Sequence, residues 1–114
     1  MEIGHRPWGY YEVIKDDEHF KTKRIVVNPN KKLSLQSHKL RSEHWICLSG
    51  SGFAQINDQM IELRPNVHVF IDCHNKHRLI NNHDQQQLVI IEIQTGTYFG
   101  EDDILRYEDD YGRV

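Results

Sequence analysis

Short apolar runs separated by turn residues are the feature of this chain that most restricts its fold. The runs include FKTKRIVV (20–27), LSLQSHKL (33–40), VHVFID (67–72) and QLVIIEIQTG (87–96). VHVFID is rich in β-branched and aromatic residues, LSLQSHKL alternates between apolar and polar residues, and turn-forming Asn, Pro and Gly lie between the runs, which is typical of β-strands joined by tight turns. About eight such strands with regular turn signals predict a sandwich or a small barrel.

Two segments carry more specific expectations. SEHWICLSG and GFAQIN (42–57) are expected to form a hairpin around the turn Gly50-Ser51-Gly52. GEDDILRYEDDYG (100–112) fits one or two helical turns, because acidic residues in a first turn are favoured by the helix dipole. It fits equally well an ordered tail held by Ile104, Leu105 and Tyr107.

Length and charge restrict the class of protein. The chain has 114 residues, enough for one domain, which we expect to span 1–114. A net charge of −3 argues against nucleic acid as a partner. No apolar run approaches the roughly 20 residues that span a bilayer. The first residues, MEIGHRPWGYY, lack the layout of a signal peptide, so we expect a cytoplasmic protein without membrane contact.

The eight histidines are unusual for this length, and imidazole is the commonest metal ligand in proteins. Strand alternation places His38 on one face with Gln36 and Leu40. If His38, Glu43 and His77 all point inward, two imidazoles and one carboxylate meet in the interior. Such a group binds a divalent metal and leaves positions open for substrate.

These residues also carry a resemblance to a known family. An HxH-type segment, a nearby Glu, six residues and a Gly form the first cupin motif, which His38, Glu43 and Gly50 match. In the second motif the His and Asn are kept as His77 and Asn81, while its Pro and Gly are replaced. The closer resemblance covers nearly the whole chain and rests on seven blocks: RPWGYY (6–11), FKTKRIVV (20–27), LSLQSH (33–38), RSEHW (41–45), LSGSG (48–52), HRLIN (77–81) and IEIQTGTYFGEDDILRYEDDYGR (91–113).

In these blocks the chain is similar to the cupin domain of type II phosphomannose isomerases, which usually follows a mannose-1-phosphate guanylyltransferase domain. The resemblance implies an all-β double-stranded β-helix, or jelly roll, with a short helical or irregular tail. It also implies a homodimer. The activity implied is the interconversion of mannose 6-phosphate and fructose 6-phosphate through a metal-assisted enediol.

Each step of that chemistry has candidate residues. The expected metal ligands are His38, Glu43 and His77, for Zn, Mn, Fe or Ni, with Gln36 as a further neutral ligand or a substrate contact. Arg41 occupies the position of the family's active-site Arg and is expected to bind substrate or stabilise the enediolate. Phosphate contacts are expected from Lys21 and Lys23, for which a solvated strand face is the competing interpretation.

Glu92 interrupts an otherwise apolar strand. If it points inward, loss of hydration raises its pKa and makes it a candidate base; an internal polar contact is the competing interpretation. Leu40 stands where the family has its second metal-binding His. We expect its methyl groups to exclude water from that ligand position, with His44 or His74 as replacements only if the backbone brings one inward.

Three functions therefore remain open from the sequence. The first is a stand-alone mannose-6-phosphate isomerase. The second is a non-catalytic cupin that binds a sugar or sugar phosphate and has a degraded metal site. The third is a different metal-cupin enzyme, such as a sugar epimerase or an oxygenase, which the two-His, one-carboxylate group permits.

Overall fold

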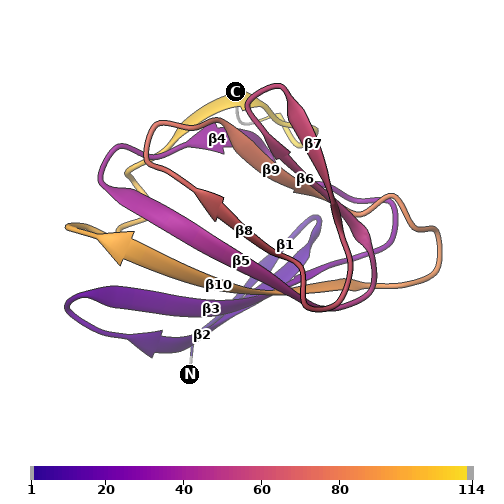
Figure 1. The fold of residues 1–114 in the computed structure, drawn as a ribbon, viewed down its shortest axis with the longest axis horizontal. Coiled ribbons are helices and arrows are strands. Elements are labelled where there is room, and N and C mark those ends of the chain that lie inside the picture. The colour runs from indigo at the N-terminus through magenta and orange to yellow at the C-terminus, as the bar shows by residue number, and fades with distance from the viewer. Residues whose placement is uncertain (1, 113–114) are drawn as a thin grey trace.

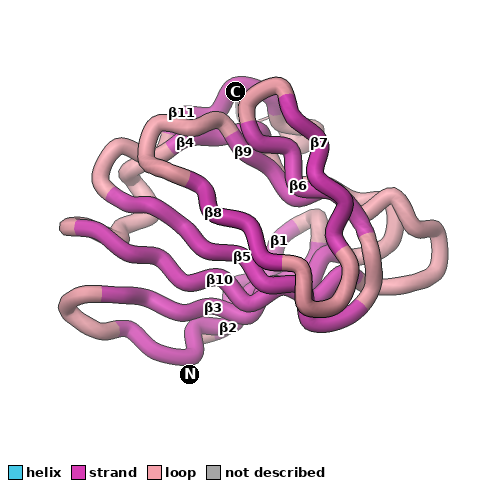
Figure 2. Tube along the Cα trace, in the orientation of Figure 1, coloured by secondary structure: helices cyan, strands magenta, loops and turns pink. Residues whose placement is uncertain are grey.

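The computed structural model describes residues 2–112, and it forms two antiparallel sheets that face each other (Figures 1 and 2). In spatial order, the six-stranded sheet contains β1 (Ile3–Arg6), β2 (Gly9–Asp16), β3 (Phe20–Val27), β10 (Leu88–Gly96), β5 (Arg41–Ser49) and β8 (His68–Ile71). The five-stranded sheet contains β11 (Leu105–Glu108), β4 (Leu35–Ser37), β9 (His77–Ile80), β6 (Gly52–Ile56) and β7 (Gln59–Leu63). The predicted all-β jelly roll is confirmed.

The expected hairpin around Gly50 is wrong. β5 ends at Ser49 and lies in the six-stranded sheet between β10 and β8, so neither of its edges is free for β6. β6 begins at Gly52 in the other sheet, where it pairs with β7 and β9. Gly50 has φ of +79°, a left-handed conformation that suits glycine. The turn therefore carries the chain from one sheet to the other.

Residues 100–112 contain no helix. Residues 101–103 form a turn, and β11 pairs antiparallel with β4, with Leu105 opposite Ser37. Tyr107 Oη and Ser37 Oγ are 2.9 Å apart across this pair. The acidic first turn was compatible with a helix, but pairing with the short strand β4 satisfies the backbone of the segment instead.

Strand β10 lies between β3 and β5, and its inward-facing side chains lie opposite inward-facing side chains of both neighbours. Glu92 lies opposite Lys23 of β3 and opposite Trp45 of β5. Two positions along, Gln94 lies opposite Glu43. All these side chains are buried, so the inner face of the sheet carries polar groups at one end.

The apolar part of the interior is contributed by both sheets. Fully buried aliphatic side chains include Ile71, Leu88 and Ile90 from the six-stranded sheet and Leu63 and Leu79 from the other. Burying each such side chain contributes about 2 kcal/mol. This packing holds in place the strands that carry the buried polar residues.

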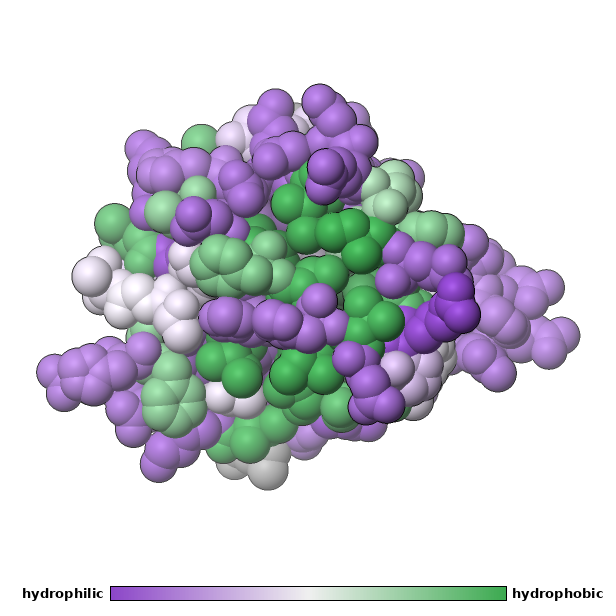
Figure 3. Space-filling model, in the orientation of Figure 1, coloured by the Kyte–Doolittle hydropathy of each residue, from purple (hydrophilic) through white to green (hydrophobic). Residues whose placement is uncertain are grey.

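On the face shown in Figure 3, apolar residues gather in the middle around β8, and hydrophilic residues surround them. Phe70 of β8 is among the exposed large apolar side chains. No helix within residues 2–112 combines the length and apolar character needed to cross a membrane.

Candidate metal and substrate site

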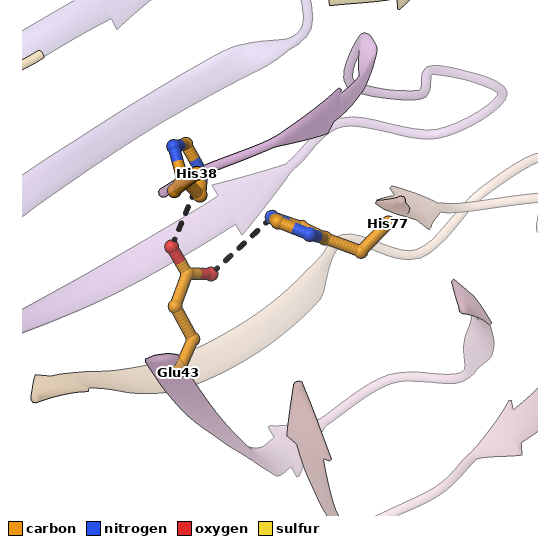
Figure 4. A group of neighbouring side chains, drawn as sticks. All are labelled: His38, Glu43 and His77. Carbon is orange, nitrogen blue, oxygen red and sulfur yellow. Dashed lines mark ion pairs between the residues drawn. The ribbon is translucent and has the colours of Figure 1, made fainter. Parts of the chain in front are cut away.

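His38, Glu43 and His77 lie together in the interior (Figure 4). Glu43 comes from β5, His77 begins β9, and His38 directly follows β4. Their candidate ligand atoms lie within 4.8 Å of one another, and all three side chains are buried. Glu43 Oε2 is 3.4 Å from His38 Nε2, and Glu43 Oε1 is 3.6 Å from His77 Nε2. The fold thus brings the three predicted ligands to one point.

Backbone carbonyls orient both imidazoles. His38 Nδ1 lies 2.6 Å from the Asp103 carbonyl, and His77 Nδ1 lies 2.9 Å from the Asn75 carbonyl. Arg41 Nη2 donates to His38 Nε2 at 3.1 Å. Because a guanidinium only donates, His38 Nε2 must accept, and the ring proton sits on Nδ1. Burial lowers the pKa of His38 to about 4, which keeps the ring neutral.

The donor set fits a divalent transition metal. Metal–ligand bonds of about 2.0–2.2 Å place neighbouring ligand atoms about 3–3.5 Å apart, close to the distances between Glu43 and the two imidazoles. A carbonyl on Nδ1 is also the usual support for a histidine that binds metal through Nε2. Two of these ligand atoms already accept hydrogen bonds from Arg41. Its Nη2 donates to His38 Nε2, and its Nε donates to Glu43 Oε2 at 2.9 Å. Metal binding through His38 Nε2 would therefore require the hydrogen bond from Arg41 to this nitrogen to break.

Leu40 does not occupy the fourth ligand position, so the expectation that its methyl groups fill that place is wrong. β4 ends at Ser37, and residues 39–40 form a turn whose amides donate to the Asp103 carboxylate at 3.1 and 2.9 Å. This turn breaks the strand alternation that put Leu40 on the face of His38. Leu40 is 48% exposed and lines neither of the two cavities beside the triad.

Glu92 is a second buried carboxyl group next to the triad. Trp45 Nε1 donates to Glu43 Oε1 at 3.0 Å and to Glu92 Oε2 at 3.3 Å. Gln94 Nε2 donates to Glu92 Oε1 at 2.6 Å. Burial, followed by the charge of Glu43, raises the pKa of Glu92 to about 7. Burial also opposes ionisation of Glu43, but His77 and other neighbours outweigh it and lower its pKa to about 2.

Two adjacent carboxyls with separated pKa values are a pattern found in acid–base sites. Here one stays ionised beside the imidazoles, while the other takes up and releases a proton near neutral pH. The arrangement can hold a cation at Glu43 and move a proton at Glu92.

The predicted substrate residues are only partly brought together. One cavity is bordered by Gln36, Lys23, Arg41 and Glu92. Gln36 Nε2 donates to Ser34 Oγ at 3.1 Å, which holds the amide at the cavity wall. Lys21 is half-buried and lines neither cavity beside the triad, so only one of the two lysines borders the site.

The C-terminal segment supplies contacts that strand patterns did not identify. Asp103 orients His38 through its carbonyl and caps the turn at Lys39 and Leu40 through its carboxylate. Glu101 accepts a hydrogen bond from Lys23. The one signal in the sequence was the acidic run GEDD (100–103), which belongs to the most specific block of the family resemblance.

His44 and His74, the two candidate replacements for the ligand missing at Leu40, do not join the triad. His44 lies on the outer face of its strand, with Nδ1 3.0 Å from His68 Nε2 and the two rings stacked. His74 is exposed in the turn after β8, with φ of +71°. Neither histidine was brought inward to replace the ligand missing at Leu40.

Comparison with known proteins gives a consistent family. The family model described as "Mannose-6-phosphate isomerase C-terminal" matches residues 2–109. XanB, a xanthan biosynthesis protein of Xanthomonas campestris, is 45% identical over 110 residues, covering 96% of this chain and 23% of the relative. A mannose-1-phosphate guanylyltransferase of Klebsiella pneumoniae is 40% identical over 109 residues, again covering 96% of this chain and 23% of the relative. This chain therefore spans about a quarter of the length of these relatives.

Solved structures with the same fold are more distant in sequence. The capsular polysaccharide assembling protein CapF of Staphylococcus aureus matches with a TM-score of 0.80 and 19% identity, over 94% of this chain and 31% of that chain. Oxalate decarboxylase of Bacillus subtilis matches with a TM-score of 0.81 and 13% identity, over 92% and 29%. With a matching family model, relatives at 40–45% identity and a jelly roll around a His/Glu/His triad, the chain belongs to the C-terminal cupin family of the mannose-6-phosphate isomerase and mannose-1-phosphate guanylyltransferase proteins.

Proposed function

We propose that this chain is a metal-dependent aldose–ketose isomerase that interconverts mannose 6-phosphate and fructose 6-phosphate. The observation that carries the proposal is Glu92, a buried carboxyl whose pKa is raised to about 7 by burial and by Glu43. A base for carbon-bound protons works best when its pKa lies near the working pH. The family resemblance of the whole chain supports the choice of substrate.

In the proposed reaction, the Glu92 carboxylate takes the proton from C2 of the open-chain aldose. The C–H electron pair forms the C1–C2 double bond of the enediolate, and the C1 oxygen gains negative charge. The Arg41 guanidinium borders the same cavity and stabilises that charge. Glu92 then returns its proton to C1, while the C2 hydroxyl passes its proton to the C1 oxygen and becomes the ketone carbonyl.

The triad has a supporting role in this proposal. His38, Glu43 and His77 would hold a divalent metal, which as a Lewis acid polarises the substrate oxygens. The neutral state of His38 and the ionised state of Glu43 are the protonation states that metal binding requires.

The second candidate is a non-catalytic cupin that binds a sugar phosphate without metal. The observation in its favour is Arg41, which donates to both Glu43 and His38 and thus engages atoms that a metal would use. In this case the guanidinium supplies a positive charge in direct contact with two of the triad residues. Nucleotidyl transfer is not proposed, because this chain covers only about a quarter of the relatives named for it.

The test is conversion of mannose 6-phosphate to fructose 6-phosphate by the purified chain, first with a chelator and then with Zn, Mn, Co or Ni restored. The matched variants are Glu92→Gln and Glu62→Gln, since Glu62 is an exposed carboxylate paired with Arg64. We expect metal-restored turnover in the wild type and in Glu62→Gln. Loss of the base should lower kcat by about 10²–10⁴-fold in Glu92→Gln.

Turnover that survives in Glu92→Gln would show that another group is the base. Absence of turnover with every metal, together with measurable binding of mannose 6-phosphate, would replace the isomerase by the non-catalytic binding cupin.

A further inference from the structure

Lys23 is an unusual lysine because its side chain is buried and its charge is kept. The residue is 5% exposed, and its ammonium lies 4.3 Å from the centre of the Tyr11 ring. Burial alone would lower the pKa of Lys23, but the carboxyls of Glu92 and Glu101 outweigh it and raise the pKa above its ordinary value. The fold thus keeps a fixed positive charge at the wall of the cavity.

The direct partner of Lys23 is the carboxylate of Glu101, and this partner is much less fixed. Glu101 lies in the turn between β10 and β11, and its side chain is 53% exposed. Lys23 sits in the middle of β3 and is held by its strand neighbours. Glu101 can therefore swing into solvent while Lys23 stays in place.

The charges around the cavity favour an anion once Glu101 has moved. Its lining includes the cations Arg6, Lys23, Arg41 and Arg106, and the carboxyls Glu92 and Glu101. The four cations thus outnumber the two carboxyls even with Glu101 in place.

A second observation points to a missing acceptor in the same cavity. Arg41 is 5% exposed, and its Nη1 is buried without a hydrogen-bond partner among residues 2–112. A buried donor without an acceptor costs about 1–3 kcal/mol. Because Arg41 lines the same cavity, an oxyanion bound there is a candidate acceptor for this donor.

We propose that Lys23, with Arg6 and Arg106 beside it, forms the subsite for a phosphomonoester dianion, and that Glu101 occupies this subsite in the unliganded protein. Phosphate and the Glu101 carboxylate then compete for the same ammonium. This inference rests on the proposed function for the identity of the sugar, but the phosphate exchange itself requires neither metal nor turnover.

The exchange also involves the triad. Glu101 and Asp103 belong to one turn, closed by the Asp103 amide donating to the Gly100 carbonyl at 3.2 Å. Asp103 in turn holds His38. Release of Glu101 by a phosphate group would therefore loosen the segment that orients a metal ligand.

The experiment measures binding of inorganic phosphate, mannose 6-phosphate and mannose to the chelator-treated protein by titration calorimetry. Glu101→Gln removes the competing charge, and we expect it to bind both phosphates about 3- to 10-fold more tightly. Lys23→Met is expected to weaken phosphate binding by at least about tenfold. Mannose without phosphate should respond to neither change.

The controls are matched in chemistry. Lys76→Met removes another lysine that lies over a ring, with Nζ 4.4 Å from the centre of Tyr107. Glu12→Gln removes another carboxylate paired with a cation of β3, Arg24 at 3.8 Å. Both should bind phosphate as the wild type does, and urea unfolding of every variant establishes that it is folded.

Unchanged or weaker phosphate binding by folded Glu101→Gln would overturn the exchange, and unchanged binding by Lys23→Met would overturn the subsite. Tighter binding by Glu101→Gln without any turnover would support the subsite while the isomerase fails. Metal-restored turnover whose KM is the same in Lys23→Met would leave the isomerase standing and refute this subsite.

Discussion

Replacing Glu92 by Gln should change how the stability of the protein depends on pH. Glutamine is a neutral isostere of the protonated carboxyl, so the variant removes the ionisation without removing the side chain. In the folded protein the pKa of Glu92 is raised from the ordinary 4.5 to about 7. That rise corresponds to about 3 kcal/mol of stability lost when the buried group ionises.

The direction in which stability changes with pH follows from the raised pKa of Glu92. Because folding favours the protonated form, its stabilising contribution is complete below about pH 4.5 and is lost as the pH rises to 7 and above. The wild type should therefore lose stability relative to Glu92→Gln across this window. Between pH 5 and pH 8 the difference in unfolding free energy should change by about 2–3 kcal/mol in favour of the variant.

Urea unfolding followed by tryptophan fluorescence, with a chelator present throughout, measures this difference. Glu62→Gln is the control, since its exposed pair with Arg64 should contribute less than about 1 kcal/mol at either pH. If wild type and Glu92→Gln differ by the same amount at pH 5 and pH 8, the carboxyl ionises normally in the folded protein. That result would refute both the raised pKa of Glu92 and its assignment as a base poised near neutrality.

Two further substitutions test other parts of the structure. Leu40→His should leave zinc affinity within about twofold of the wild type, because position 40 is exposed and its amide donates to the Asp103 carboxylate. Competition with a chromogenic chelator measures this affinity. A tenfold gain would mean that the turn brings residue 40 to the metal. Asn81→Ala should lower the unfolding free energy measured in urea by about 3 kcal/mol. The buried Asn81 amide donates to the carbonyls of Val27 and Gln86 at 3.0 and 2.8 Å, and its oxygen accepts a hydrogen bond from the His83 amide. A loss below about 1 kcal/mol would show that water replaces these hydrogen bonds.

The strands themselves were predictable from local sequence. FKTKRIVV and QLVIIEIQTG became β3 and β10, because β-branched residues favour extended backbone whatever lies beside them. Period-2 alternation also placed Glu43 with Trp45, and Glu92 with Gln94, on common faces, and in both cases that face is the buried one. Local patterns cannot say which strands pair, and for this reason the hairpin at Gly50 was wrong.

The cluster of His38, Glu43 and His77 could be anticipated from motif order, whereas the surroundings of these residues could not. Alternation assigned Leu40 to the face of His38, but the turn capped by Asp103 moves Leu40 outside. Asp103 lies 65 positions from His38 in the chain, so no local signal links them. The same holds for Lys23 and Glu101, whose pairing depends on where the C-terminal segment crosses the barrel.

The sequence by itself determined the extended segments, the polar residues on their inner faces and the family, because these depend on residue type and spacing along the chain. Only the tertiary structure decided the protonation states. Glu43 and Glu92 are the same residue type on adjacent strands, yet one pKa falls to about 2 and the other rises to about 7. Burial acts on both carboxyls, and the imidazoles and guanidinium packed against Glu43 make the difference. Arg41 and His38 lie within five positions of Glu43 in the chain, but His77 comes from β9, and only folding brings its ring beside the Glu43 carboxylate.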